Sequence, residues 1–411
     1  MAGKCLFALV LVLAVASASA QSALPVAQVW TGSWAASQQL PEPQNSLAPD
    51  DLCDATLRQI VHLSAGGSAI RLHLSNAFGT QTLHLASVHV ARPVSAASAK
   101  IDPASDRAVT FSGRPDVIIP AGADYLSDPV AFPVPPLSDL AVSIHYDEAP
   151  ASQTGHPGSR ATSYLVHGDA AAAADMADAK KFDHWYQLAG VDVAGGAGAI
   201  VALGDSITDG HGATTNGNDR WTDVLAQRLQ ANEATRSIGV LNEGIGGNHL
   251  LTDGLGPNVL ARLDRDVLAP EAVKWVIVFE GVNDLGGLAQ NGEVTPEAHA
   301  ARVQSVIAAY QQIILRAHAH GLRVYGVTVT PYAGSDYYHP GPLSEADRQA
   351  VNQWIRATGH FDAVIDFDAV VRDPAHTDRL LPAYDCGDHL HPSPAGYKAM
   401  GEAIQLALFA R

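Results

Sequence analysis

The chain is short of basic residues, since 25 Lys and Arg stand against 42 Asp and Glu and give a formal net charge of −17. Phosphate backbones and anionic lipid surfaces are bound mainly by clusters of Lys and Arg. The deficit therefore disfavours nucleic acid, anionic membranes and polyanionic substrates as partners. Neutral substrates are left open, and the acidity by itself selects no activity.

Long hydrophobic runs are also scarce, and the most apolar stretch lies at the N-terminus. Lys4 precedes an apolar segment from Leu6 to about Val15, and Ala18-Ser19-Ala20 follows it. A positive start, an apolar stretch too short to span a bilayer and an A-x-A site are typical of a signal peptide. We expect residues 1–20 to be removed after Ala20. The mature protein is then predicted to be soluble and secreted or periplasmic.

Cysteine is nearly absent, and of the three in the chain Cys5 lies in the expected signal peptide. Cys53 and Cys386 are left after processing. An even pair of cysteines in an exported protein is a disulfide candidate, with two separate thiols as the alternative. We expect a Cys53–Cys386 bond, which would hold the N-terminal region against the loop that contains Asp388.

The first part of the chain alternates apolar and polar residues with a period of two, from about Leu24 to Asp169. The alternating runs, such as 57–63 and 139–146, are short and separated by turn clusters rich in Gly and Pro. Many short strands with regular turns predict an antiparallel β-sandwich or jelly roll. We assign residues 21–170 to this domain and the alanine-rich segment 171–198 to a linker.

The second part, residues 199–411, changes to alternating strands and helices. Helices are predicted from the Thr295-Pro296 cap to Gly321, from a capping box at 344–347, and from Pro394 to Ala410. This alternation predicts a flavodoxin-like, doubly wound parallel α/β sheet. The predicted strands are the apolar runs 200–203, 238–241, 275–279, 324–329 and 363–367.

Four polar blocks fall at or just after predicted strand ends in this second domain. The carboxyl edge of an open parallel sheet is the usual place for ligand chemistry. These blocks contain the types of residue that acyl transfer requires. The blocks are Gly204-Asp205-Ser206-Ile207-Thr208, Asn242-Glu243-Gly244-Ile245-Gly246-Gly247-Asn248, Gly281-Val282-Asn283-Asp284 and Asp388-His389-Leu390-His391-Pro392.

A serine hydroxyl becomes a nucleophile when an imidazole takes its proton, and a carboxylate must fix the tautomer of that imidazole. Ser206 supplies the hydroxyl, and Asp388 and His391 lie three residues apart in one loop. The negative charge that develops on the carbonyl oxygen needs preorganised donors. The backbone N–H groups of Ser206 and Gly247 and the side-chain amide of Asn283 would provide them.

Each block taken alone also has an ordinary structural interpretation. Residues 244–247 could form only a turn, Asn283-Asp284 a helix cap, and Asp388 with His391 a capping pair. Asp385 is an alternative to Asp388 as the orienting carboxylate. His389-x-His391 is compatible with a metal ion, but no third and fourth ligand accompany it in the sequence. No metal or other cofactor is therefore expected.

Together, the four blocks resemble the SGNH (GDSL) hydrolase family over residues 199–411. The resemblance implies that Ser206 is the nucleophile, that His391 is the base and that Asp388 orients it. It also implies that Gly247 and Asn283 complete the oxyanion hole.

Two positions depart from the pattern of this family. Ile207 stands where many members have leucine, and His389 stands where small residues are common, so His389 is expected at the rim of the substrate site. An α/β-hydrolase is disfavoured because no G-x-S-x-G motif occurs in the chain.

The N-terminal region resembles, more loosely, the β-sandwich that precedes the catalytic domain in some exported SGNH esterases. Related two-domain enzymes deacetylate plant polysaccharides, so the resemblance favours carbohydrate esters. We predict a secreted serine esterase that removes short acyl groups, above all acetyl, from carbohydrate or related neutral esters. The alternatives are a lipase or lysophospholipase for longer acyl chains and an inactive glycan-binding module.

A tyrosine-rich loop, residues 331–340, follows a predicted strand and is expected to border the active site. Tyr337 and Tyr338 are suited to stacking on a sugar ring or an aromatic acid. The alternative is that the loop packs its own aromatic side chains.

Overall fold

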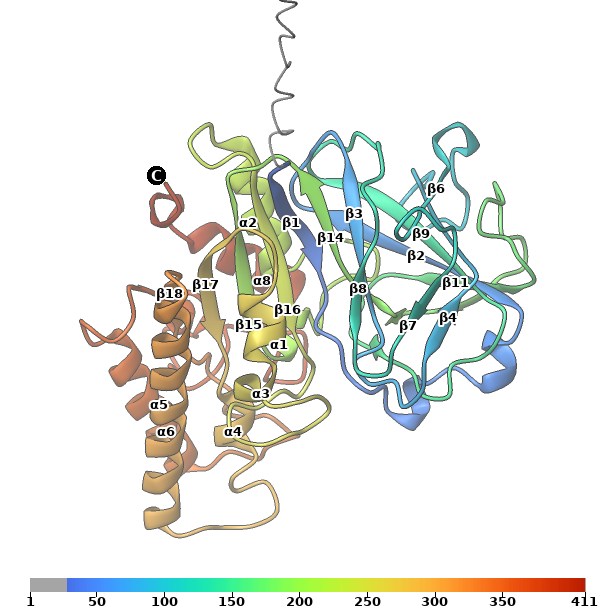
Figure 1. The fold of residues 1–411 in the computed structure, drawn as a ribbon. Coiled ribbons are helices and arrows are strands. Elements are labelled where there is room, and N and C mark those ends of the chain that lie inside the picture. Colours follow the sequence, from blue (N-terminus) through green and yellow to red (C-terminus); the bar gives the residue numbers. More distant parts are fainter. Residues whose placement is uncertain (1–27, 411) are drawn as a thin grey trace, which may run out of the picture.

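The computed structural model describes residues 28–410 and contains two domains that lie side by side (Figure 1). The expected signal peptide, residues 1–20, lies outside the described residues. Within residues 28–410 no helix is both long enough and apolar enough to cross a membrane.

The N-terminal domain consists of short strands in mostly antiparallel sheets. One sheet has the order β1-β14-β3-β8 and the other has the order β12-β11-β2-β9-β5-β6, with β4-β7 and β10-β13 as separate pairs. The strands are β1 (Trp30–Ala35), β2 (Ala55–Leu63), β3 (Ile70–Ser75), β4 (Leu83–Leu85), β5 (Ser87–Ala91), β6 (Arg107–Ala108), β7 (Val117–Ile119), β8 (Asp124–Leu126), β9 (Ser138–Tyr146), β10 (Gly155–His156), β11 (Ser163–His167), β12 (Lys180–Phe182), β13 (Trp185–Tyr186) and β14 (Leu188–Ala194).

The two larger sheets face each other across one apolar core. Alternate residues of β2 and β9 point into this core, as the period-two pattern predicts, and they meet alternate residues of β3 and β14. The predicted β-sandwich is therefore confirmed. The inward residues include Leu57, Val61, Leu63, Leu140, Val142, Ile144, Ile70, Leu72, Leu74, Val191 and Val193.

The segment expected to be a linker, residues 171–198, differs from that expectation. It contains β12, β13 and β14, and β14 is a central strand that pairs with both β1 and β3. The connection between the domains is therefore short, because β15 already begins at Gly198. The alanine-rich composition of residues 170–175 concealed the strands that follow it.

The C-terminal domain is built on a five-stranded parallel sheet with the order β16-β15-β17-β18-β19. This order is that of flavodoxin-like sheets, as predicted. Helix α2 packs against α8, and α5 packs against α6 on the side away from the sandwich (Figure 1). The elements are β15 (Gly198–Gly204), α1 (Ser206–Asp209), α2 (Trp221–Ala231), β16 (Ile238–Gly244), α3 (Val259–Leu263), the π-helical η4 (Asp264–Leu268), β17 (Val273–Phe279), α4 (Val282–Gly286), α5 (Pro296–Ala319), β18 (Arg323–Val327), α6 (Pro342–Arg356), β19 (Ala363–Ile365), α7 (Phe367–Val371) and α8 (Pro394–Ala403).

Two predicted helix ends need correction. Helix α6 begins at Pro342, with proline in its first turn, so Ser344 lies inside the helix and does not cap it. Helix α8 ends at Ala403, because Ile404 has an extended backbone with φ −67° and ψ 124°. The long helix α5 begins at its predicted cap, Thr295, whose side chain accepts a hydrogen bond from the N–H of Ala298.

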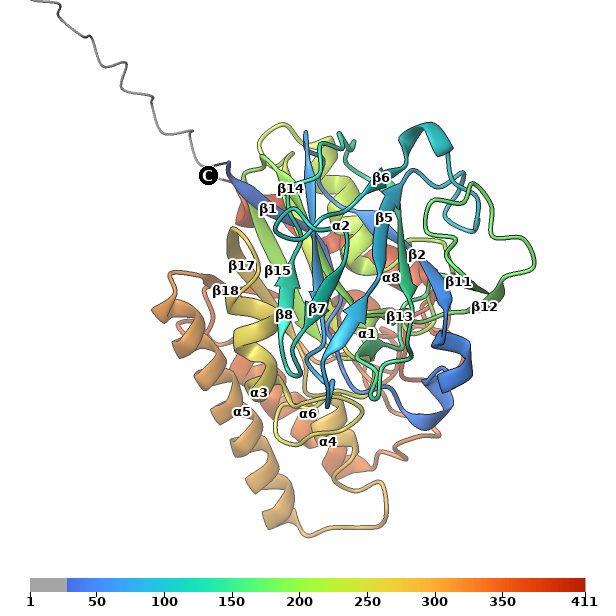
Figure 2. The same ribbon diagram turned by 45° about the vertical axis from the view of Figure 1, so that its right-hand side comes forward.

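The domains meet at β1 of the sandwich, which lies next to the parallel sheet in Figure 2 and packs along β16, the edge strand of that sheet. The backbones approach so closely that a Cβ on Gly239 would lie 1.9 Å from the carbonyl oxygen of Gly32. Ser64 of the sandwich also exchanges hydrogen bonds with the backbone of Val240, at 2.8 and 3.2 Å. The sandwich thus covers a sheet edge that would otherwise be open to another chain.

The predicted disulfide between Cys53 and Cys386 is wrong in this structure, because both thiols are free. Cys53 follows a short turn of the sandwich, where its carbonyl oxygen lies 3.3 Å from His167 Nδ1. Cys386 instead faces Gly212 of the C-terminal domain. The even number of cysteines gave no information on the distance between them.

We expect thiol titration of the mature protein in denaturant, without reductant, to label both Cys53 and Cys386. In the folded protein Cys386 should react slowly, because partial desolvation and the nearby Asp388 charge raise the pKa of its thiol to about 11. Peptide mapping by mass spectrometry provides the measurement. A peptide that links the two cysteines would contradict this expectation.

Candidate active site

Ser206 lies at the point where β15 ends and α1 begins. Asp205 caps this short helix, since its Oδ1 accepts a hydrogen bond of 2.9 Å from the N–H of Ile207. Burial raises the pKa of Asp205 to about 7. The Ser206 N–H is the first of the helix and has no intrahelical acceptor. The cap therefore holds the serine at the carboxyl edge of the parallel sheet.

The loop before α8 brings His391 and Asp388 to this serine. Ser206 Oγ lies 2.7 Å from His391 Nε2, and His391 Nδ1 lies 2.6 Å from Asp388 Oδ2. The other oxygen of Asp388 accepts the backbone N–H groups of Leu390 and His391. Burial opposes ionisation of Asp388, but the hydrogen bonds from His391 outweigh it and the pKa of Asp388 is well below its usual value. This geometry permits proton transfer from serine to histidine.

The alternative carboxylate, Asp385, is bonded to a different histidine. Asp385 Oδ2 lies 2.6 Å from His389 Nδ1, and Asp385 Oδ1 accepts the backbone N–H of His389. His389 is exposed and lies against Gly334 of the tyrosine-rich loop, so it sits at the edge of the site. The structure thus brings Asp388, and not Asp385, to His391.

The three donors predicted for the oxyanion belong to residues that follow the ends of β15, β16 and β17, which are neighbouring strands of the sheet. Gly247 has a φ of +66°, which favours glycine, and in the described part of the chain its N–H has no acceptor. Asn283 lies in the first turn of α4 and donates from Nδ2 to the carbonyl oxygen of Asn248, at 2.6 Å. One Nδ2 hydrogen of Asn283 is left for a ligand.

Tyr338 holds the Asn283 amide in this orientation. Its hydroxyl lies 2.5 Å from Asn283 Oδ1, and burial keeps the pKa of Tyr338 far above its usual value, so the phenol donates. Because Nδ2 must face the carbonyl of Asn248, Oδ1 must face the phenol. Tyr338 is 4% exposed and Tyr337 is 64% exposed. Of the two tyrosines expected at the rim, only Tyr337 offers its ring to solvent.

A second histidine, His211, was missed by the sequence analysis although it follows Ser206 by five positions. Its ring lies 4.0 Å from the ring of His391, and its Nε2 lies 3.7 Å from Asp388 Oδ2. Burial, followed by the His391 and Arg160 charges, lowers the pKa of His211 to about 4. His211 is therefore neutral at pH 7 and packs against the ring of His391 as an uncharged ring.

Two overlapping groups in the described chain have ligand atoms close enough to hold a metal ion, within 4.8 Å of one another. One is His211, Asp388 and His391, and the other is Asp385, Cys386 and Asp388. Both groups depend on Asp388, whose carboxylate is already hydrogen-bonded to His391. An ion bound there would compete with the contact that orients His391.

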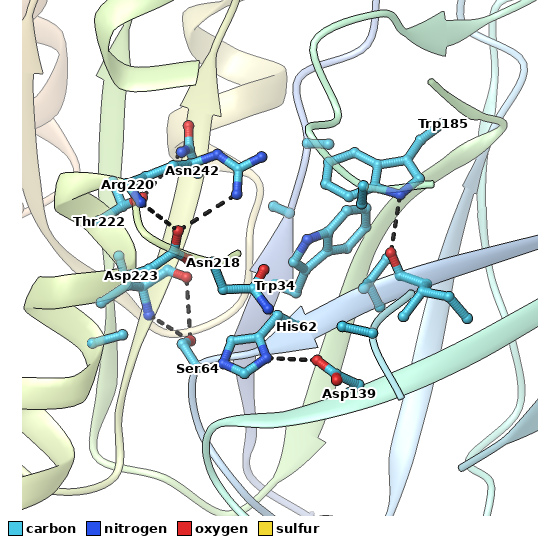
Figure 3. Close-up of a pocket in the computed structure, with 18 of the residues that line it drawn as sticks. Trp34, His62, Ser64, Asp139, Trp185, Asn218, Arg220, Thr222, Asp223 and Asn242 are labelled. Atoms are coloured by element: carbon cyan, nitrogen blue, oxygen red, sulfur yellow. Dashed lines mark hydrogen bonds and ion pairs between the residues drawn. The ribbon is translucent and has the colours of Figure 1, made fainter. Parts of the chain in front are cut away.

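A separate pocket lies between the two domains (Figure 3). Trp34 and Trp185 line it from the sandwich, and Arg220, Asp223 and Asn242 line it from the catalytic domain. Its volume of about 50 Å³ has room for a few water molecules only. The pocket is therefore a gap in the domain interface and is too small to hold a sugar ring.

Comparisons with known proteins match about half of the chain. The model of the GDSL-like Lipase/Acylhydrolase family matches residues 202–399, and no curated protein matches the chain. Similar solved structures include a lipolytic protein of the G-D-S-L family from Desulfitobacterium hafniense DCB-2, with 24% identity, a TM-score of 0.36 and coverage of 50% of this chain and 97% of that one. Another is an acetylxylan esterase from Geobacillus stearothermophilus, with 23% identity, a TM-score of 0.38 and coverage of 51% and 93%.

We expect His391→Ala to lower kcat for 4-nitrophenyl acetate by at least about 1000-fold, because the serine loses its proton acceptor. His389→Ala is the matched control in the same loop and should change kcat less than about threefold, since His389 contacts Asp385 and not Ser206. Equal losses in both variants would show that the assignment of the histidine is mistaken.

We expect Tyr338→Phe to lower kcat about tenfold with little change in KM, because the freed amide of Asn283 no longer holds its donor in place. In an Asn283→Ala background the same substitution should have no further effect. The control is Tyr332→Phe, which removes a buried hydroxyl without a hydrogen-bond partner among the described residues. An unchanged kcat in Tyr338→Phe would contradict this role.

Proposed function

We propose that the protein is a carboxylic ester hydrolase with Ser206 as its nucleophile, and the match of residues 202–399 to the model of the GDSL-like Lipase/Acylhydrolase family supports this. The observation that carries the proposal is the continuous hydrogen-bonded path from Ser206 Oγ through His391 to Asp388. We propose Asn283 and Gly247 as donors to the developing oxyanion, because they follow β17 and β16, the two strands that pair with β15.

In the proposed mechanism, His391 Nε2 takes the Ser206 proton as Oγ attacks the ester carbonyl carbon. The carbonyl oxygen becomes an oxyanion, which accepts hydrogen bonds from the N–H groups of Ser206 and Gly247 and from Asn283 Nδ2. When the C–O bond to the alcohol breaks, His391 returns the proton to the leaving oxygen. His391 then takes a proton from water as the water attacks the acyl-serine, and it returns the proton to Ser206 Oγ as the acid is released.

The substrate we propose is a short-chain ester, above all an acetyl ester, of a carbohydrate or a related neutral alcohol. The two-domain arrangement, with a β-sandwich before the catalytic domain, supports the carbohydrate preference. The flanks of the triad also support it, because His211, His389 and Tyr337 are exposed and leave room for an extended alcohol. Exposed aromatic rings are suited to sugar faces.

One observation favours the alternative, a lipase or lysophospholipase for longer acyl chains. Leu255 is 51% exposed and its side chain lies next to Gly247, on the oxyanion side of the serine. Leu40 of the N-terminal domain is also exposed, and Gln39 beside it bonds to the carbonyl oxygen of Leu255. An acyl chain could extend along these leucines.

The proposed location is outside the cytoplasm, secreted or periplasmic, after cleavage at Ala20. The support is the order of charge, apolar stretch and A-x-A site in residues 1–20.

Acyl-chain preference separates the two substrate classes. We expect kcat/KM to be at least about tenfold higher for 4-nitrophenyl acetate than for the decanoate, because the exposed Leu255 and Leu40 compensate little for the ordering of a long chain. We also expect release of acetate from acetylated xylan. The measurement is initial-rate kinetics on the two aryl esters together with acetate release from the polymer.

The matched control is Ser206→Ala, which should lose all of these activities. Leu255→Ser tests the alternative, since it should lower hydrolysis of the decanoate more than that of the acetate if the leucine binds acyl chains. Faster hydrolysis of the decanoate in the parent protein would replace the short-chain proposal with the lipase.

A further inference from the structure

We propose that Arg160, which the N-terminal domain contributes to the catalytic centre, binds an acceptor oxygen on the alcohol part of the ester substrate. This inference rests on the proposed function, because it assumes that Ser206 and His391 cleave an ester. It goes beyond that function by assigning recognition of the alcohol to a residue outside the matched family segment, 202–399.

Arg160 contacts His211, and the ring of His211 packs against the ring of His391. Its Nη2 lies 3.4 Å from Nδ1 of His211, and the His211 ring lies 4.0 Å from the ring of His391. Since a guanidinium can only donate, His211 Nδ1 accepts and the His211 proton lies on Nε2, toward Asp388. Arg160 is therefore at the flank of the triad and does not bond to the reacting groups themselves.

The flank that Arg160 occupies is the one where the alcohol of the ester must lie. His391 has to return a proton to the leaving oxygen, so this oxygen must come close to His391 Nε2. The donors for the carbonyl oxygen, Gly247 and Asn283, belong to other loops, after β16 and β17. Groups beyond His391, namely His211 and Arg160, thus face the alcohol and not the acyl group.

The guanidinium of Arg160 has few hydrogen-bond partners among the described residues. Its side chain has the single contact with His211, its Nε is buried without a hydrogen-bond partner, and no carboxylate in residues 28–410 lies within ion-pair distance. Arg220 nearby instead bonds to two backbone carbonyls and to Asp223. Unused donors beside a catalytic histidine fit hydroxyl, ring or carboxylate oxygens of a sugar.

The loop that presents Arg160 is fixed to the catalytic domain. His156 Nε2 lies 2.8 Å from the buried Asp209 carboxylate of α1, and Arg220 donates to the carbonyl oxygen of Ser159. The carbonyl oxygen of Arg160 accepts the N–H of Asn216, at 2.8 Å. Arg160 itself has a φ of +48°, a conformation that non-glycine residues adopt rarely and that often marks functional sites.

The test compares three acetyl esters that share the acyl group and differ in the alcohol. Phenyl acetate has no acceptor beyond the leaving oxygen, an acetylated methyl glucoside adds hydroxyl and ring oxygens, and the corresponding glucuronoside adds a carboxylate. We expect Arg160→Gln to lower the ratio of kcat/KM on the sugar esters to kcat/KM on phenyl acetate by about tenfold to a hundredfold, the worth of one charged hydrogen bond. Arg160→Lys should lower this ratio less than Arg160→Gln does.

Both ways in which the ratio can fall support the proposal. A loss confined to the glucuronoside identifies a carboxylate as the ligand, and similar losses on both sugars identify hydroxyl or ring oxygens. A ratio within about twofold of the parent on both sugars would overturn the proposal, including the case where all three activities fall together because His211 has been disturbed.

The matched control is Arg107→Gln, which removes the same charge from an exposed residue of β6 that bonds only to carbonyls of its own loop. Its ratios and activities should equal those of the parent, and the melting temperature of Arg160→Gln should confirm folding. Failure of the proposed function is recognised separately, because the parent would then hydrolyse none of the three esters or Ser206→Ala would retain activity.

Discussion

The buried guanidinium of Arg262 is the contact on which the arrangement of the active site depends. It donates to the carbonyl oxygens of Gly204 and Glu243, at 3.1 and 2.8 Å, where β15 and β16 end. It also donates to Asn248 Oδ1, at 3.0 Å, in the loop that contains Gly247. Its Nη1 also donates to Ser37 Oγ of the N-terminal domain, at 2.9 Å. One cation thus holds two strand ends, the oxyanion loop and the domain interface together.

Such a buried cation is stable only if a counter-ion and enough acceptors surround it. Asp266 supplies the charge: burial alone would raise its pKa, but Arg265 and Arg262 outweigh burial and lower it. Burial instead raises the pKa of Glu243 and of Glu280 well above the usual value, which favours their neutral forms. The site therefore keeps one ionised carboxylate for Arg262 and avoids a cluster of buried negative charges behind Ser206.

The sequence predicted the parts of this molecule that follow from local patterns. Strand ends in a parallel sheet share one edge, so the blocks at Ser206, Gly247 and Asn283 could be placed together before any coordinates were known. Contacts between distant segments gave no such signal. Arg262 lies 225 positions from Ser37, and Tyr338 lies 55 positions from Asn283. Likewise, counting two cysteines could not reveal that they lie in different surroundings.

The N-terminal domain contacts the proposed catalytic centre without the disulfide that was expected to attach it. On the acyl side its Gln39 bonds to the carbonyl oxygen of Leu255, next to Gly247. On the opposite side its Arg160 contacts His211 beside the catalytic histidine. Between these points the shared backbone contact of β1 with β16 leaves little freedom for the domains to rotate. The proposed triad comes from one domain, whereas residues of both domains lie on its flanks, so we expect selectivity to depend on an interface that the catalytic motifs do not encode.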